Sequence, residues 1–142
     1  MKGNIMTFDL AKNNFAEMAE VGYEFELKLP VTDEGTGAFI KVRGDDSKTV
    51  KSFGRRKLAE YQARAAAAKK RGKEPDDLTY EEAEDVAIEA AIIRIIDWRG
   101  INDGGEKVVF TKESADKILR EHSWIREQIM EESAQVLNFR SR

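Results

Sequence analysis

Side chains suited to catalysis or metal binding are few in this chain. The single histidine is His122, and cysteine is absent, which excludes thiolate zinc sites, disulfides and a cysteine nucleophile. Because zinc at His122 would need carboxylates for its remaining ligands, an uncommon set, we expect the imidazole to end a helix instead, where it suits the negative dipole end. The sequence therefore predicts no metal and no cofactor.

Three further stretches resemble binding loops only superficially. Residues 44–47 and Asn102–Asp103 lack the alternating oxygen ligands, closed by a glutamate, that a calcium loop requires. The glycines of the 99–105 loop do not follow a strand with the spacing of a phosphate-binding loop. Glu81 and Glu82 fall in the first turn of a predicted helix, where the helix dipole favours acids. We expect turn and capping roles, no catalytic residue and no enzymatic activity.

Charge is unevenly distributed along the 142 residues, although the net charge is only −3. Residues 48–73 hold ten basic side chains and one acid, and residues 74–97 hold nine acids and one base. The two stretches could pair with each other as a helical hairpin, or between neighbouring copies in an assembly. Alternatively, the basic stretch could hold nucleic-acid phosphates.

Hydrophobic periodicity predicts the elements that position these charges. Alternation at Tyr23–Leu29 and at 38–43 predicts an antiparallel hairpin. Helical spacing predicts a short N-terminal helix and four main helices, the second of them opened by a Thr79–Glu82 capping box. The expected helices span residues 9–19, 48–71, 79–98, 111–121 and 124–139.

We therefore expect an α+β fold, mostly α-helical, with one N-terminal hairpin. The interpretation is a single domain over residues 1–142, in which 1–22 form a helix or arm, 23–43 the hairpin and 48–139 the helical part. A chain of this length can bury a sufficient core without disulfides or metals.

The sequence also predicts the compartment. The most apolar stretch, Ala87–Ile96, is shorter than the roughly 20 residues that cross a bilayer, so no membrane partner is expected. The first 20 residues carry charges throughout and predict no signal peptide. The lack of cysteine suits a reducing compartment, and we expect the cytoplasm.

Several short motifs follow one another from about Phe25 to Phe139. Their residues are Leu27, Leu29, Pro30, Thr32, Val42, Gly44, Asp45, Asp46, Ser47, Trp98, Gly100, Gly105, Phe110, Thr111, Ser123, Trp124, Ile125, Arg126, Gln128, Ile129, Asn138 and Phe139. The order of these motifs resembles the tail assembly chaperones of long-tailed bacteriophages. Two departures concern loops: Ser123 stands where such proteins often have proline, and Glu34 is inserted in the sheet turn.

This resemblance implies a non-enzymatic protein of the host cytoplasm, absent from the mature virion. It would bind and solubilise the tape measure protein and help recruit tail tube subunits. Because that client is long and largely helical, we expect helix-in-groove binding by copies arranged as a ring or spiral. The contact candidates are Trp98, Trp124, Ile125, Ile129 and Phe139, the last because an apolar residue near a chain end needs a partner.

Two alternative functions stay open at this point. The protein could be another phage structural protein, such as a head-to-tail connector or minor tail component, which finished particles would retain. It could also be a small nucleic-acid-binding regulator that uses residues 48–73, for which salt-dependent DNA binding would be the sign.

Overall fold

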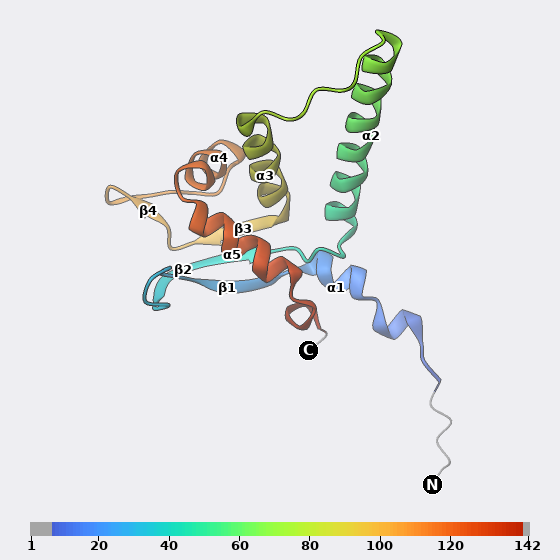
Figure 1. Cartoon of the computed structure of the whole chain (residues 1–142). Coiled ribbons are helices and arrows are strands. Elements are labelled where there is room, and N and C mark those ends of the chain that lie inside the picture. The colour runs from blue at the N-terminus through green and yellow to red at the C-terminus, as the bar shows by residue number, and fades with distance from the viewer. Residues whose placement is uncertain (1–6, 141–142) are drawn as a thin grey trace.

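Three strands form an antiparallel sheet in the structure, a computed structural model that describes residues 7–140 (Figure 1). Their spatial order is β1-β2-β3, with β1 at Tyr23–Lys28, β2 at Gly35–Val42 and β3 at Ile95–Arg99. Ile40 in the central strand pairs with Phe25 on one side and Trp98 on the other. All three side chains are buried, since strand side chains alternate between two faces and this row meets the helices.

Three helices cover the buried face of the sheet (Figure 1): α3 at Tyr80–Arg94, α4 at Lys112–Glu121 and α5 at Ser123–Ala134. Their apolar sides and the sheet share one core. Its buried members are Ala19, Phe25, Leu27, Ala38, Ile40, Val42, Ile88, Ala91, Ile95, Trp98, Ala115, Ile118, Leu119, Ile125, Ile129 and Phe139.

The opposite face of the sheet is polar. Arg99 Nη2 lies 2.9 Å from Glu24 Oε1, and the Arg99 guanidinium carbon lies 4.1 Å from the ring centre of Phe39. The hydrogen bonds from Arg99 hold the pKa of the Glu24 carboxyl below its ordinary value. This face is therefore stabilised by surface ion pairing and cation–π contact, not by a second layer of helices.

The edge strand β1 is bound by a side chain of α5. The Lys28 N–H donates to Gln128 Oε1 at 3.0 Å, and Gln128 Nε2 donates to the Lys28 carbonyl at 2.8 Å. One glutamine amide thus satisfies the donor and the acceptor of a strand residue, as a neighbouring strand would.

The N-terminal segment is helical but interrupted. It forms the 3₁₀ helix η1 at Leu10–Asn13 and then α1 at Phe15–Val21. The continuous helix predicted over residues 9–19 is wrong because the Asn14 side chain accepts the Glu17 N–H at 3.1 Å and starts a new helix. Gly22, with φ +95°, ends α1, as the sequence predicts. Residues 1–6 of the predicted arm lie outside the described residues.

The long helix α2 spans Lys48–Lys70 and stands away from the other elements along most of its length (Figure 1). Ser47 caps it by accepting the Val50 N–H at 3.1 Å, which confirms the predicted capping region at residues 44–47. Of the 23 residues in α2, only Val50, Phe53 and Ala68 are buried. The side chains of α2 are therefore packed in the protein only near its two ends, and those in its middle are exposed or half-buried.

A two-stranded ribbon follows β3, formed by β4 at Asn102–Asp103 and β5 at Glu106–Lys107. The main chain after it turns back to the core, where Trp98 Nε1 donates to the Val108 carbonyl at 2.8 Å. The Trp98 ring meets Phe110 edge-on at 5.1 Å. The segment after the ribbon thus provides Trp98 with a hydrogen-bond acceptor for its N–H and an aromatic contact for its ring.

The fold class predicted from the sequence is wrong. We expected a mostly helical α+β domain with one hairpin and about four main helices. Within residues 7–140 the structure is a mixed α/β arrangement of five α-helices and two small sheets. The main cause lies at α3, which was expected to continue to about Trp98 but ends at Arg94 and passes directly into β3.

A cluster of polar contacts around Arg43 enforces this change from helix to strand. The Arg43 N–H donates to the Arg94 carbonyl at 2.6 Å, and Arg43 Nη1 donates to the carbonyls of Ile93 at 2.9 Å and Ile95 at 3.3 Å. These bonds satisfy carbonyls that a continuing helix would have paired internally. The end of β2 therefore determines where α3 ends.

The last predicted helix also ends early. We expected it to run from Trp124 to about Phe139 with Ser123 as N-cap, but α5 begins at Ser123 and ends at Ala134, followed by the 3₁₀ helix η2 at Val136–Phe139. Ser133, fully inside the protein, donates its hydroxyl to the Arg43 carbonyl at 2.7 Å and accepts the Asp45 N–H with its own carbonyl at 2.9 Å. His122 ends α4, as the sequence predicts.

Candidate functional site

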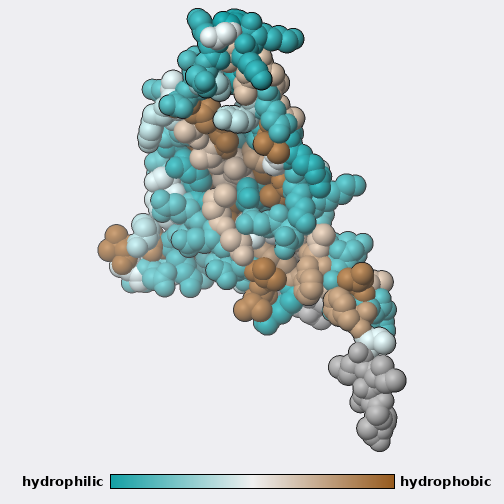
Figure 2. Space-filling model, turned by 45° about the vertical axis from the view of Figure 1, so that its right-hand side comes forward, coloured by the Kyte–Doolittle hydropathy of each residue, from teal (hydrophilic) through white to brown (hydrophobic). Residues whose placement is uncertain are grey.

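The strongest candidate for a binding site is a hollow of about 360 Å³ between α2 and α3, which we call the α2–α3 groove. Figure 2 shows tan and brown apolar atoms between hydrophilic margins in the upper part of the molecule, where α2 lies. The lining residues are Lys57, Glu60, Tyr61, Arg64, Leu78, Glu82, Asp85 and Val86.

Apolar side chains form the interior of the groove. Tyr61 follows Lys57 at helical spacing on the side of α2 that faces α3, yet its side chain is 61% exposed. The Leu78 side chain is 51% exposed. Both are uncovered because α2 diverges from α3 and stands apart from it along its upper part (Figure 1). Exposed large apolar groups gathered in a concave site with a charged rim are typical of protein-binding surfaces.

Two ion pairs cross the groove and set its width. Lys57 Nζ lies 3.0 Å from Glu89 Oε2, and Arg64 Nη1 lies 3.0 Å from Glu82 Oε2. The helical hairpin pairing predicted from the charge runs is therefore present, but it joins just these two basic residues of α2 to α3 among the described residues. The hydrogen bond that Lys57 donates to Glu89 is the main cause that raises the pKa of Lys57.

Glu82 has a second role, at the start of α3. The Thr79 hydroxyl accepts the Glu82 N–H at 3.1 Å and Glu82 Oε1 accepts the Thr79 N–H at 3.3 Å, which confirms the predicted capping box. The bond from the Thr79 backbone, followed by the bond from Arg64, lowers the pKa of the Glu82 carboxyl. One carboxylate therefore starts the helix and holds the groove rim.

The base of α2 is held by Glu20 from α1. Glu20 accepts the Thr49 N–H at 2.9 Å, the Thr49 hydroxyl at 2.7 Å and Arg43 Nε at 3.0 Å. Burial acts to raise the pKa of Glu20, but the hydrogen bonds from Thr49 and Arg43 together outweigh it and lower the pKa. Because Arg43 also ends α3, this Glu20–Arg43–Thr49 cluster fixes the lower ends of both groove helices.

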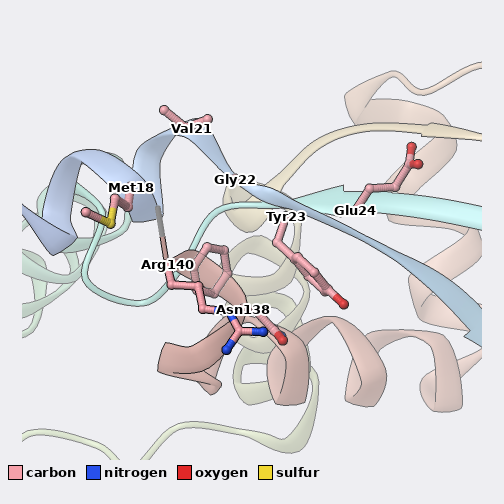
Figure 3. A pocket seen from close by; sticks show the side chains of 8 residues that line it. Met18, Val21, Gly22, Tyr23, Glu24, Asn138 and Arg140 are labelled. Carbon is pink, nitrogen blue, oxygen red and sulfur yellow. The ribbon is translucent and has the colours of Figure 1, made fainter. Parts of the chain in front are cut away.

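A second hollow, of about 580 Å³, lies between the junction of α1 with β1 and the C-terminal segment (Figure 3). Met18, Val21 and Tyr23 come from α1 and the start of β1, and Asn138 and Arg140 from the C-terminal segment. Phe139 is buried here and meets the Tyr23 ring edge-on at 6.2 Å. The partner that the sequence requires for Phe139 is thus provided within the chain.

The other predicted contact residues are also mostly internal. Trp98, Ile125 and Ile129 are buried in the core, while Trp124 is half-buried and lines two surface hollows. In this conformation four of the five candidates present little surface to a partner. The structure does not bring the five together in one groove.

The sequence interpretation missed Leu78, although a signal for it exists. An apolar residue directly before an N-cap usually packs against the fourth helical residue, as a hydrophobic staple. Here that residue is Ala83, which is too small to cover a leucine. Leu78 is therefore left for another partner.

The described residues show no arrangement typical of catalysis. Every pKa shift resolved among them favours the charged form, as surface ion pairs do: Glu20, Glu24 and Glu82 are lowered, and Lys57, Arg99 and Arg120 are raised. Residues 7–140 contain no group of three potential metal ligands. No helix in that range is long and apolar enough to span a membrane.

A protein-family model described as YdaY prophage protein matches residues 49–142, about two thirds of the chain. The chain belongs to the YdaY prophage protein family. No curated protein and no solved structure matches it. The phage origin that the resemblance implied is thereby confirmed, and the specific role in tail assembly stays a prediction.

The part of the chain shared with the YdaY family contains the whole α2–α3 groove. The match begins at the second residue of α2 and includes α3, β3, α4 and α5, whereas β1 and β2 precede it. The hollow of about 580 Å³ is lined partly by Met18 and Tyr23, which lie outside the family match. The groove is therefore the candidate site that belongs entirely to the family.

Proposed function

We propose that this phage protein is a tail assembly chaperone that binds and solubilises the tape measure protein and helps recruit tail tube subunits, without enzymatic activity. The observation that carries the proposal is the open α2–α3 groove, in which Tyr61 and Leu78 lack cover. An apolar face of a long helical client is the chemistry that would fill it, by helix-in-groove binding.

The groove matches such a client in pattern and charge. On α2 the lining residues Lys57, Tyr61 and Arg64 follow one another at spacings of four and three, so they form one continuous stripe. Full burial of a large apolar side chain contributes about 1.5–3 kcal/mol, so covering Tyr61 and Leu78 offers substantial binding energy. The charged rim would set the register of the client more than its affinity.

We propose no enzymatic activity because of the direction of the pKa shifts. Catalytic acids and bases usually have pKa values moved toward neutrality by burial or like charges. The resolved shifts in residues 7–140 go the other way. Hydrogen bonds from Thr79 and Arg64 lower the pKa of Glu82, and the hydrogen bonds that Arg120 donates to Asp116 and Asp85 raise the pKa of Arg120. A role in noncovalent binding accounts for these groups.

Co-expression with the tape measure protein of the same phage tests the proposal. The wild-type chain should increase the soluble fraction of the tape measure protein and be recovered with it. Tyr61→Asp combined with Leu78→Asp should abolish both effects, because each change places a charge inside the groove. The matched control is Leu58→Asp, since Leu58 is also on α2 and 56% exposed but does not line the groove.

Two results would refute this function. One is a tape measure protein that is equally soluble without the chain, or equally well bound by the groove and control variants. The other is recovery of the chain in stoichiometric amounts from finished particles, which would favour the connector or minor tail component instead.

A further inference from the structure

The side of α2 that faces away from α3 is basic and has no partner in the chain. We call it the α2 outer face and define it as Lys48, Lys51, Arg55, Lys69 and Lys70, which helical geometry places opposite the groove stripe. All five are exposed, and within residues 7–140 none takes part in an ion pair. A helix that is polar on nearly every side gains little from packing and is stabilised by partners.

An acidic hollow of about 350 Å³ lies elsewhere on the molecule, between the turn of the β1–β2 hairpin and α5. We call it the α5 acidic groove. It contains five acids and one base, and half-buried Trp124 and exposed Leu29 provide apolar surface. Its charged residues are Glu26, Lys28, Asp33, Glu127, Glu131 and Glu132.

The acids of this groove are not neutralised by the chain itself. Glu26 accepts the Gly37 N–H at 3.0 Å and Glu132 accepts Asn138 Nδ2 at 2.7 Å, but both bonds leave the negative charge in place. No ion pair within residues 7–140 involves any of the five acids. A concave surface with a net charge of −4 is complementary to a basic occupant.

The two complementary surfaces lie on different sides of the molecule. In Figure 1 the hairpin turn is at the left and α2 is at the right. A chain cannot place its own α2 in its own α5 acidic groove without unfolding, whereas a second copy can. Unlike patches that fit each other produce head-to-tail contacts, which close into rings or extend as spirals.

We propose that the α2 outer face of one copy docks into the α5 acidic groove of a second copy. The lower part of the face, with Lys48, Lys51 and Arg55, then brings three positive charges to a groove with a net charge of −4, and Trp124 is covered by the aliphatic stems of the lysines. The use of this contact to coat a client rests on the proposed function. The contact itself does not, so the two can fail separately.

Nucleic acid fits the α2 outer face less well. Residues 74–97 follow α2 directly and contain nine acids and one base, and exposed Glu74, Asp76, Asp77 and Glu81 border its upper end. These charges would repel a phosphate backbone lying along the helix. The acidic groove of a second copy would contact the lower part of α2, at Lys48, Lys51 and Arg55, away from these acids.

Sedimentation equilibrium of the full chain tests the contact without any client. At about 50 mM salt the average mass should exceed the 16.1 kDa of one chain and rise with concentration. At about 500 mM salt it should fall toward one chain, because exposed ion pairs are screened. A wild-type chain that remains monomeric at low salt would overturn the proposal, most directly if it shifts a DNA duplex that Lys51→Glu with Arg55→Glu no longer shifts.

Charge reversal on each surface identifies the interface. Lys51→Glu with Arg55→Glu removes one half of the contact, and Glu127→Lys with Glu131→Lys removes the other, so each variant alone should self-associate at least tenfold more weakly. The two variants mixed should associate again, because the unchanged α2 outer face of one fits the unchanged groove of the other and the two reversed surfaces also complement each other. A chain with all four changes should regain self-association.

The matched control is Lys107→Glu with Lys112→Glu, which changes the net charge equally at exposed positions outside both surfaces. It should associate like the wild type. If it weakens association as strongly as the α2 variant, or if the two reversed variants fail to associate when mixed, the contact is not the one proposed.

Discussion

α2 and α3 are consecutive helices held by opposite means. The 15 residues of α3 include the fully buried Ile88 and Ala91 and pack against α4 and α5. The 23 residues of α2 bury three side chains near its ends, and from residue 54 to 64 none is buried. Local stability in proteins follows such differences in packing. The less packed helix is the one on which we propose two binding surfaces, one for a client and one for a neighbouring copy.

The largest expected effect is a difference in stability between one side-chain truncation in α3 and one in α2. Ile88→Ala should lower the free energy of unfolding by about 2–5 kcal/mol, because it leaves a cavity in the core under the sheet. Leu58→Ala on α2 should change it by less than about 0.5 kcal/mol, because Leu58 is mostly exposed. Urea unfolding of both variants measures the contrast. Equal losses would mean that α2 is packed as tightly as α3.

The next effect concerns the cluster at the base of α2. Glu20→Gln removes the negative charge that faces Arg43 and weakens the bonds to Thr49, and should cost about 1–2 kcal/mol. Chemical unfolding at pH 7 measures the loss. Glu24→Gln, on the polar face of the sheet, is the control and should cost less.

The pH dependence gives an independent check on Glu20. Because its pKa is lowered in the folded protein, its contribution is fully present above its ordinary value of 4.5 and is lost as the pH falls through the folded value. Stability of the wild type should therefore decline below about pH 4.5 more steeply than that of Glu20→Gln. Parallel pH profiles would show that the cluster does not hold the carboxylate in its charged form.

The smallest effect refines the contrast within α2 itself. Gly54 follows the buried Phe53 in α2 and is itself exposed, and a Cβ added there would meet no atom within 4 Å. Gly54→Ala should stabilise the helix by up to about 1 kcal/mol. Hydrogen exchange should slow at the amides of residues 54–64 while those of β2 remain unchanged. Uniform slowing would show that α2 opens only together with the core.

Local signals in the sequence were sufficient where local chemistry decides the structure. The hairpin at 23–43 follows from alternation, and the starts of α2, α3 and α4 follow from Ser47, Thr79 and Thr111. The change at Ile95 could not be predicted in this way. The isoleucines at 92, 93, 95 and 96 suit a buried helix or a buried strand equally, and the choice is made by Arg43 and β2 from about 50 residues earlier.

The candidate site illustrates the same limit. From sequence, aromatic residues near helix ends seemed the best contacts, yet Trp98 and Phe139 have partners inside the chain, namely Phe110 and Tyr23. Tyr61 belongs to a stripe that also contains the buried Val50 and Phe53, so its pattern alone suggested core packing. Its exposure depends on how far α2 diverges from α3, which is set by tertiary structure.

The clamp of Gln128 on Lys28 has a consequence for a protein that would accumulate in many copies on one client. An open sheet border invites identical chains to add strand upon strand into fibrils. The Gln128 amide occupies the edge of β1 at Lys28, so a strand of another chain cannot easily pair at that position. We therefore expect copies to associate through the proposed contact between the α2 outer face and the α5 acidic groove, which salt can reverse.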